Sequence, residues 1–237
     1  MTRTPVRGTI YEMIWPILAV IFVLSMLLIV SLAAGLTLKI DFWNRNKTKI
    51  LFFYIAWFIP YVLFILFFTG PSDLSVYPPQ SESPYRLPWK AGVGRLVAQG
   101  NRSFTSHREL HEFAWDFVMP IGTPVLAARD GIVKEATDSD DGIGVKPNNF
   151  VIIEHQDGQR SGYFHLSKGK VLVKEGDFVK RGQPIALSGM VGQTWFPHLH
   201  FLVFNKDKTA SLPISFADVP GGVPLAGHLY TSQNGSL

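Results

Sequence analysis

The chain has 237 residues, of which 47% are hydrophobic and 17% charged, with a formal net charge of +4 and no cysteine. This apolar share excludes a disordered chain, and the length allows one or two domains with a sizeable core. The lack of cysteine excludes a disulfide scaffold, a thiolate zinc site and a thiol nucleophile.

The charge is unevenly distributed along the chain. Residues 1–70 contain six basic and two acidic residues, whereas residues 71–237 contain sixteen of each and are neutral overall. Nucleic-acid binding is therefore disfavoured, because the second part has neither net positive charge nor a basic patch interleaved with aromatic residues.

Two uncharged stretches in the first part predict membrane spans. Residues 13–38 and 50–69 contain no charged side chain, and each is long enough for a helix to cross a hydrocarbon core of about 30 Å. A cleaved signal peptide is the alternative for the first stretch, but its apolar run is too long for one. We therefore expect residues 1–69 to form a membrane anchor of two transmembrane helices.

The loop charges predict how the anchor is oriented. The connector at 39–49 holds four basic residues, Lys39, Arg45, Lys47 and Lys49. Basic loops stay in the cytoplasm, so the connector is expected inside and the segment after position 70 outside the cytoplasmic membrane. Residues 70–100 are rich in Pro and Ser, and this composition predicts a stiff, extended linker.

Residues 101–206 read as an all-β domain, an antiparallel sandwich or barrel, followed by a tail at 207–237. Asp157-Gly158 between two β-type runs is a strong hairpin signal. Short apolar runs separated by turn residues predict strands at 114–117, 123–128, 131–136, 149–155, 161–166, 170–173, 184–188 and 199–204.

The histidines of this domain indicate which chemistry it performs. His198 and His200 stand two apart on a predicted strand, so both rings point to one face. His165 ends a neighbouring run, and Asp116 is an acid inside an apolar run, where a carboxylate is costly unless it is paired or binds a metal. Two histidines and a carboxylate suit a catalytic zinc site. We expect His155 and His228 to be ordinary hydrogen-bonded histidines.

Several blocks resemble the lysostaphin/LytM-type zinc metallopeptidase family. They occur in the family's order, at 114–133, 149–155, 157–158, 163–166, 173–183 and 197–201. The resemblance implies a β-sheet core of the duplicated, barrel-sandwich hybrid type. It also implies one zinc ion and hydrolysis of peptide bonds in bacterial cell-wall peptidoglycan.

Carried over by position, the resemblance makes Asp116 and His200 zinc ligands, and His165 and His198 catalytic histidines. The family's first histidine stands four residues before the aspartate, where this chain has Glu112. A longer form of the motif fits Ser106-His107, so His107 is the expected first ligand, with His111 in reserve and Glu112 disfavoured. Thr194, Trp195 and Phe196 replace the small residues usual before the final His-x-His, and these aromatics are expected to narrow the cleft.

The sequence therefore predicts a multi-pass membrane protein with a zinc endopeptidase domain facing the periplasm or cell exterior. Its partners would be peptidoglycan peptides and the lipid bilayer, and the anchor also allows a regulatory membrane partner. Two alternatives stay open: a non-catalytic regulator of other wall hydrolases from the same family, and a lipoyl/biotinyl-like adaptor. The adaptor shares the motifs at 130–133 and 175–183, but it leaves His165, His198 and His200 unexplained.

Overall fold

A computed structural model describes residues 73–103, 106–144 and 148–235, with eight separate positions between 45 and 59. The chain divides into two compact units, Met1–Leu63 and Phe64–Leu237. The predicted span 13–38 lies outside the described residues, as does 50–69 except for four helical positions. Among the described residues, no helix is long and apolar enough to cross a membrane.

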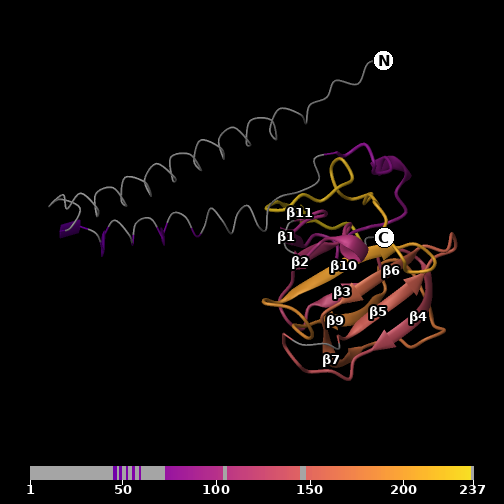
Figure 1. The fold of residues 1–237 in the computed structure, drawn as a ribbon. Coiled ribbons are helices and arrows are strands. Elements are labelled where there is room, and N and C mark those ends of the chain that lie inside the picture. The colour runs from indigo at the N-terminus through magenta and orange to yellow at the C-terminus, as the bar shows by residue number, and fades with distance from the viewer. Residues whose placement is uncertain are drawn as a thin grey trace, which may run out of the picture. The chain divides into compact units, whose positions relative to one another are not determined.

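The second unit is built on two antiparallel sheets (Figure 1). The larger has eight strands in the order β11-β1-β2-β10-β6-β5-β4-β8, and the smaller has three in the order β3-β9-β7. The strands are β1 Gly94–Gln99, β2 Trp115–Val118, β3 Pro124–Leu126, β4 Gly131–Thr137, β5 Phe150–Glu154, β6 Arg160–Phe164, β7 Leu166–Val171, β8 Phe178–Val179, β9 Pro184–Ser188, β10 His198–Phe204 and β11 Leu229–Thr231. Two 3₁₀ helices, η1 Gln80–Glu82 and η2 Glu109–His111, complete the described elements.

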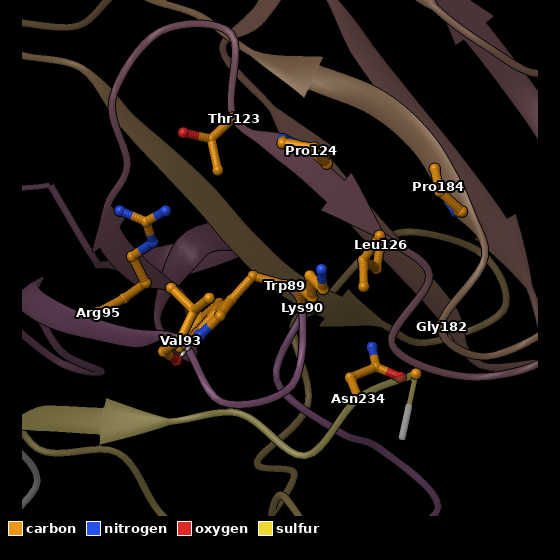
Figure 2. Close-up of a pocket in the computed structure, with 11 residues that line it drawn as sticks. Trp89, Lys90, Val93, Arg95, Thr123, Pro124, Leu126, Gly182, Pro184 and Asn234 are labelled. Carbon is orange, nitrogen blue, oxygen red and sulfur yellow. Dashed lines mark hydrogen bonds between the residues drawn. The ribbon is translucent and has the colours of Figure 1, made fainter. Parts of the chain in front are cut away.

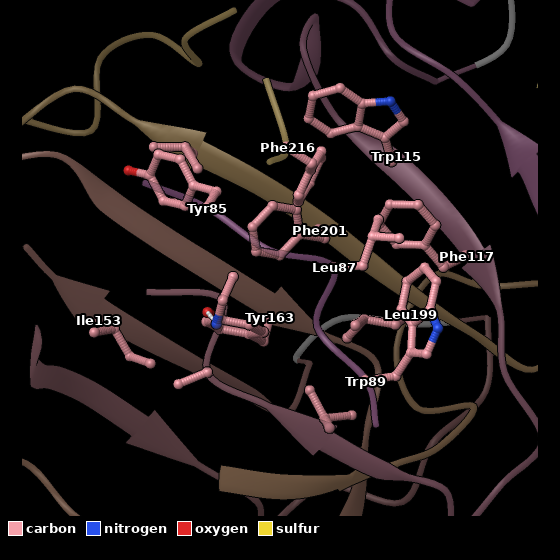
Figure 3. Close-up of a cluster of buried hydrophobic side chains, with 14 of the residues drawn as sticks. Tyr85, Leu87, Trp89, Trp115, Phe117, Ile153, Tyr163, Leu199, Phe201 and Phe216 are labelled. Atoms are coloured by element: carbon pink, nitrogen blue, oxygen red, sulfur yellow. Dashed lines mark hydrogen bonds between the residues drawn. The ribbon is translucent and has the colours of Figure 1, made fainter. Parts of the chain in front are cut away.

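Strand β10 lies at the centre of the core. All seven of its residues are buried, which is typical of a strand covered on both faces. Phe201 of β10 packs edge-on against Tyr163 of β6, and Trp115 of β2 packs edge-on against Phe216, both with ring centroids 5.2 Å apart (Figure 3). Because aromatic rings bury large areas and prefer defined geometries, this cluster fixes β2, β6 and β10 relative to one another.

The predicted hairpin is confirmed. Strands β5 and β6 pair antiparallel, and Gly158 in the turn has a φ of 82°. That left-handed conformation suits glycine, which has no Cβ to clash with the backbone. Eight strands correspond to the eight predicted runs, and the antiparallel all-β domain is as expected.

The expectation of an extended linker is wrong for residues 73–100. Tyr85, Leu87 and Trp89 are buried in the core, and β1 pairs with both β2 and β11. The Pro/Ser composition masked a few large apolar residues in this segment. Burying their side chains stabilises the folded chain, whereas an extended spacer would leave them exposed to water. Prolines are compatible with the irregular backbone between these residues.

The tail at 207–237 also packs into this unit. Phe216 and Val219 are buried with the core, and β11 extends the sheet. The buried Asp218 carboxylate accepts the backbone N–H of Leu87 at 3.0 Å and that of Gln233 at 2.9 Å. Tail and predicted linker therefore hold each other in place around the family-like strands.

His155 is a structural histidine, as expected. Its Nδ1 donates to the Asp130 carbonyl at 2.8 Å, and its Nε2 lies 3.0 Å from Ser161 Oγ. Burial lowers the pKa of His155 from 6.5 to about 4. The fold therefore keeps this ring neutral at pH values where the unfolded chain binds a proton.

This difference predicts a pH-dependent stability. Between pH about 4 and 6.5 the unfolded state binds more protons at His155, so its stabilising contribution is complete above pH 6.5 and is lost as the pH falls toward 4. We expect wild type to lose about 2 kcal/mol more unfolding free energy than His155→Gln between about pH 7.5 and about pH 5 in urea titrations. Equal losses in the two proteins would contradict the assignment.

Candidate active site

Asp116 is the centre of a histidine cluster on neighbouring strands. It lies on β2 directly opposite His200 of β10 in the antiparallel register. Its Oδ1 accepts from His200 Nδ1 at 2.8 Å, and it lies 3.3 Å from both His107 Nε2 and His198 Nε2. His198 and His200 share a face because side chains alternate along a strand, so one carboxylate oxygen meets three rings.

His107 and His111 enter the site from the segment between β1 and β2. His107 is fully buried, and its Nδ1 donates to the Gly100 carbonyl at 2.8 Å. This bond fixes the ring so that Nε2 faces Asp116. His111, at the end of η2, places Nδ1 2.9 Å from His200 Nε2. His200 is thus contacted through both ring nitrogens.

His165 follows β6 and has a φ of 63°, a conformation few residues other than glycine adopt. The Asn148 side-chain oxygen accepts its backbone N–H at 3.0 Å. His165 Nδ1 donates to the Val191 carbonyl and His198 Nδ1 to the Phe196 carbonyl, both at 2.8 Å. With its proton on Nδ1, the neutral His165 ring presents Nε2 to the site, whereas His198 Nε2 lies 3.3 Å from the Asp116 carboxylate.

The pKa values of the cluster's side chains are shifted in different directions. Burial raises the pKa of Asp116, but the charges and hydrogen bonds of His198 and His107 outweigh burial and hold it well below its usual value. Burial lowers the pKa of His198, but the charge and hydrogen bond of Asp116 outweigh burial and raise it. Burial lowers the pKa of His165 to about 4 and that of His200 to about 3. Asp116 is therefore an anion beside rings of unequal basicity.

The cluster contains two candidate metal sites. His107, Asp116 and His200 can each offer one ligand atom within 4.8 Å of the others, and so can His165, His198 and His200. The first set combines two imidazoles with a carboxylate, which are zinc donors and leave a coordination position open. A carboxylate buried in the core needs a charged partner, and a metal ion bound beside Asp116 would be such a partner. These residues therefore fit a zinc ion.

All five predicted site residues lie in this one cluster, and the reserve residue His111 lies there too. Glu112 is not part of this cluster. Its carboxylate pairs with Arg102 at 2.7 Å on the surface. Trp195 is 91% exposed, whereas the Phe196 ring lies 4.6 Å from the His198 ring. Of the two aromatics expected to narrow the cleft, only Phe196 lies against a site residue.

Sequence reasoning missed the residues that orient the rings. Asn148, Val191 and the Gly100 carbonyl act from loops and irregular segments. Two of these three contacts use backbone carbonyls, which every residue possesses, so side-chain identity carried no signal for them. The sequence held no signal for Asn148, because its contact with His165, 17 positions away, exists only in the fold.

The comparisons with known proteins match part of this chain to peptidases. Residues 111–212 match the family model described as Peptidase family M23. Lysostaphin from Staphylococcus simulans is 48% identical over 122 residues, covering 50% of this chain and 24% of the relative. Peptidoglycan DD-endopeptidase ShyA from Vibrio cholerae is 44% identical over 109 residues, covering 46% of this chain and 24% of the relative.

A solved structure of the catalytic domain of lysostaphin from Staphylococcus simulans is 32% identical, covers 53% of this chain and 88% of that chain, and superposes with a TM-score of 0.38. The chain spans about a quarter of the length of the two curated relatives. The predicted membership of a zinc metallopeptidase family is confirmed by the family match and by the relatives. Residues 111–212 of this chain belong to peptidase family M23.

Proposed function

We propose that this chain is a zinc metalloendopeptidase that hydrolyses peptide bonds in bacterial cell-wall peptidoglycan. The observation that carries the proposal is the Asp116-centred cluster, which joins a zinc-type donor set to two further histidines. The names of the relatives, a lysostaphin and a peptidoglycan DD-endopeptidase, support the substrate class.

His107, Asp116 and His200 would hold the zinc ion. A bound zinc ion supplies Lewis acidity, which polarises a carbonyl and lowers the pKa of a water to about 7. Zinc binding requires neutral imidazoles, and burial favours that state at His200. The Gly100 carbonyl positions His107 by accepting a hydrogen bond from its Nδ1–H.

His165 and His198 would move protons at their Nε2 atoms. In both rings Nδ1–H donates a hydrogen bond to a backbone carbonyl, so Nε2 of the neutral ring can accept the proton of the attacking water. Once protonated, the same atom can donate to the developing oxyanion or to the leaving amine. Their ring centroids lie 4.6 Å apart, which lets the two act on one reacting group.

The alternative function is a non-catalytic regulator of other wall hydrolases. A regulator would need neither a complete ligand set nor oriented catalytic rings. The buried cluster offers a candidate ligand set and two further rings oriented by backbone carbonyls, and this favours the enzyme. The adaptor alternative is disfavoured by the same cluster, because it assigns no function to the histidines.

Substitutions of His198 and His200 should separate metal binding from catalysis. His200→Ala should lose both zinc and hydrolysis, since it removes a ligand. His198→Ala should keep zinc and lower hydrolysis about 10²–10⁴-fold, the usual range for general acid–base catalysis. Zinc content and muropeptide digestion measure both effects, with exposed His228→Ala as the control. An inactive, zinc-free wild type would instead indicate the regulator.

The first zinc ligand can be decided between two nearby histidines. His107→Ala should lower zinc affinity and activity far more than His111→Ala, because His107 Nε2 contacts Asp116 whereas His111 contacts His200 Nε2. A residue that only orients a ligand typically costs about 10–100-fold in metal affinity. Zinc titration of both variants measures the difference, and wild-type behaviour of His107→Ala would reject this ligand assignment.

We further propose that the peptidase domain faces outward from the bacterial cytoplasmic membrane, anchored by residues 1–69, with room for a regulatory membrane partner. The support is the basic connector at 39–49 beside the neutral second part of the chain.

The lack of native cysteine allows a direct test of this topology. Lys174→Cys, between β7 and β8, should react with a membrane-impermeant maleimide in intact spheroplasts. Arg45→Cys in the connector should react only after lysis. Both positions are exposed within their described segments, so a reversed labelling pattern would reject the orientation.

A further inference from the structure

The segment at 189–197 forms the surface next to the two histidines that the proposed mechanism uses for proton transfer. The Val191 carbonyl accepts from His165 Nδ1, and the Phe196 carbonyl accepts from His198 Nδ1. By contrast, the pocket of about 410 Å³ in Figure 2 is lined by none of the histidines of the cluster. Contacts with a substrate close to its reacting bond are therefore made on the surface that this segment provides.

Trp195 projects from this segment into solvent and is 91% exposed. Its two neighbours are held in place. Thr194 is buried, and its hydroxyl donates to the Phe196 carbonyl at 2.8 Å. The centroid of the Phe196 ring lies 4.6 Å from that of the His198 ring. An indole with few rotatable bonds on a fixed backbone loses little conformational freedom when a ligand covers it.

Two loops beside the same segment also expose apolar side chains. Ile121 lies in a loop whose Gly122 N–H donates to the carbonyl of Ser188, just before the segment, at 2.8 Å. Ile143 lies in a loop that pairs with the segment at Gly192. The two isoleucines are 61% and 59% exposed. A single exposed apolar residue is ordinary, but several on adjoining segments beside a candidate site indicate a surface for a ligand.

The position of Trp195 in the chain limits which part of a substrate it can contact. Trp195 stands three residues before His198, so their Cα atoms are at most about 11 Å apart. An extended peptide advances about 3.3 Å per residue, so this distance corresponds to roughly three substrate residues. A peptide whose reacting bond lies at the histidine cluster can therefore place a residue close to that bond against the indole.

We propose that Trp195 is a specificity-determining residue that binds an apolar side chain of the substrate peptide close to the reacting bond. It would direct the proposed peptidase, on whose function this assignment rests, toward cross-links with alanine side chains beside the bond and away from oligoglycine. Burial of a methyl group against the indole stabilises the bound peptide, whereas glycine has no side chain to bury. The indole N–H can also donate to a substrate carbonyl.

Cleavage of three substrates by the zinc-loaded full chain in detergent micelles tests the assignment. The substrates are a cross-linked stem-peptide dimer with alanines beside the reacting bond, the same dimer carrying its disaccharides, and pentaglycine. Wild type should cleave the peptide dimer with a kcat/KM about tenfold or more above that for pentaglycine. Trp195→Ala should raise KM for both dimers about tenfold with little change in kcat, because it removes a binding contact.

Two further variants are the controls. Trp195→Phe should restore most of the lost affinity, because an aromatic face is kept. Phe178→Ala, which removes an exposed aromatic side chain from β8, should leave KM unchanged. An unchanged KM in Trp195→Ala would overturn the assignment. A rise in KM for the disaccharide-carrying dimer alone would overturn it in favour of a glycan contact, and equal cleavage of pentaglycine and the peptide dimer would overturn the preference for side chains.

A binding measurement separates this assignment from the proposed catalysis. The peptide dimer should shift the tryptophan emission of the His198→Ala protein to shorter wavelength, because the exposed indole becomes covered. Addition of Trp195→Ala should remove most of this shift and weaken binding about tenfold. If wild type cleaves none of the substrates, the proposed function fails. Weaker dimer binding by Trp195→Ala would then still support the peptide contact, and equal binding with and without Trp195 would overturn it.

Discussion

The buried carboxylate of Asp116 is the constraint on which the rest of the site depends. An isolated carboxylate in the middle of a covered sheet would be strongly destabilising. Here one oxygen is approached by rings from β10 and from the segment before β2. Once those rings surround Asp116, their other nitrogens must also be satisfied, and backbone carbonyls of two separate segments do this for His107 and His198.

This dependence gives the loops a chemical role. The 189–197 segment supplies carbonyls to two histidines from Val191 and Phe196. Asn148 of a neighbouring loop holds the backbone of His165 in its left-handed conformation. Rigid strands place the side chains, and irregular segments choose the nitrogen that each presents. A change in either loop would therefore alter the orientation of these histidine rings without replacing a residue of the cluster.

The strands and the chemically distinctive residues were predictable because both follow local rules. Alternation along a strand placed His198 and His200 on one face, and an acid in an apolar run marked Asp116. The packing of residues 73–100 was not predictable from composition, because Tyr85 and Trp89 are separated by residues typical of linkers. The segment is held in the core by residues more than a hundred positions away, because the Leu87 backbone hydrogen-bonds to Asp218 and Asn234.

The pairing of β1 with β2 has a consequence for where the enzyme begins. The family match starts at residue 111, yet His107 lies before it and β1 hydrogen-bonds to the strand that carries Asp116. A fragment cut at the limits of the match would turn β2 into an unprotected edge strand and discard a zinc-type donor. In this chain, the residues that form the fold and the site extend beyond the residues that match the family.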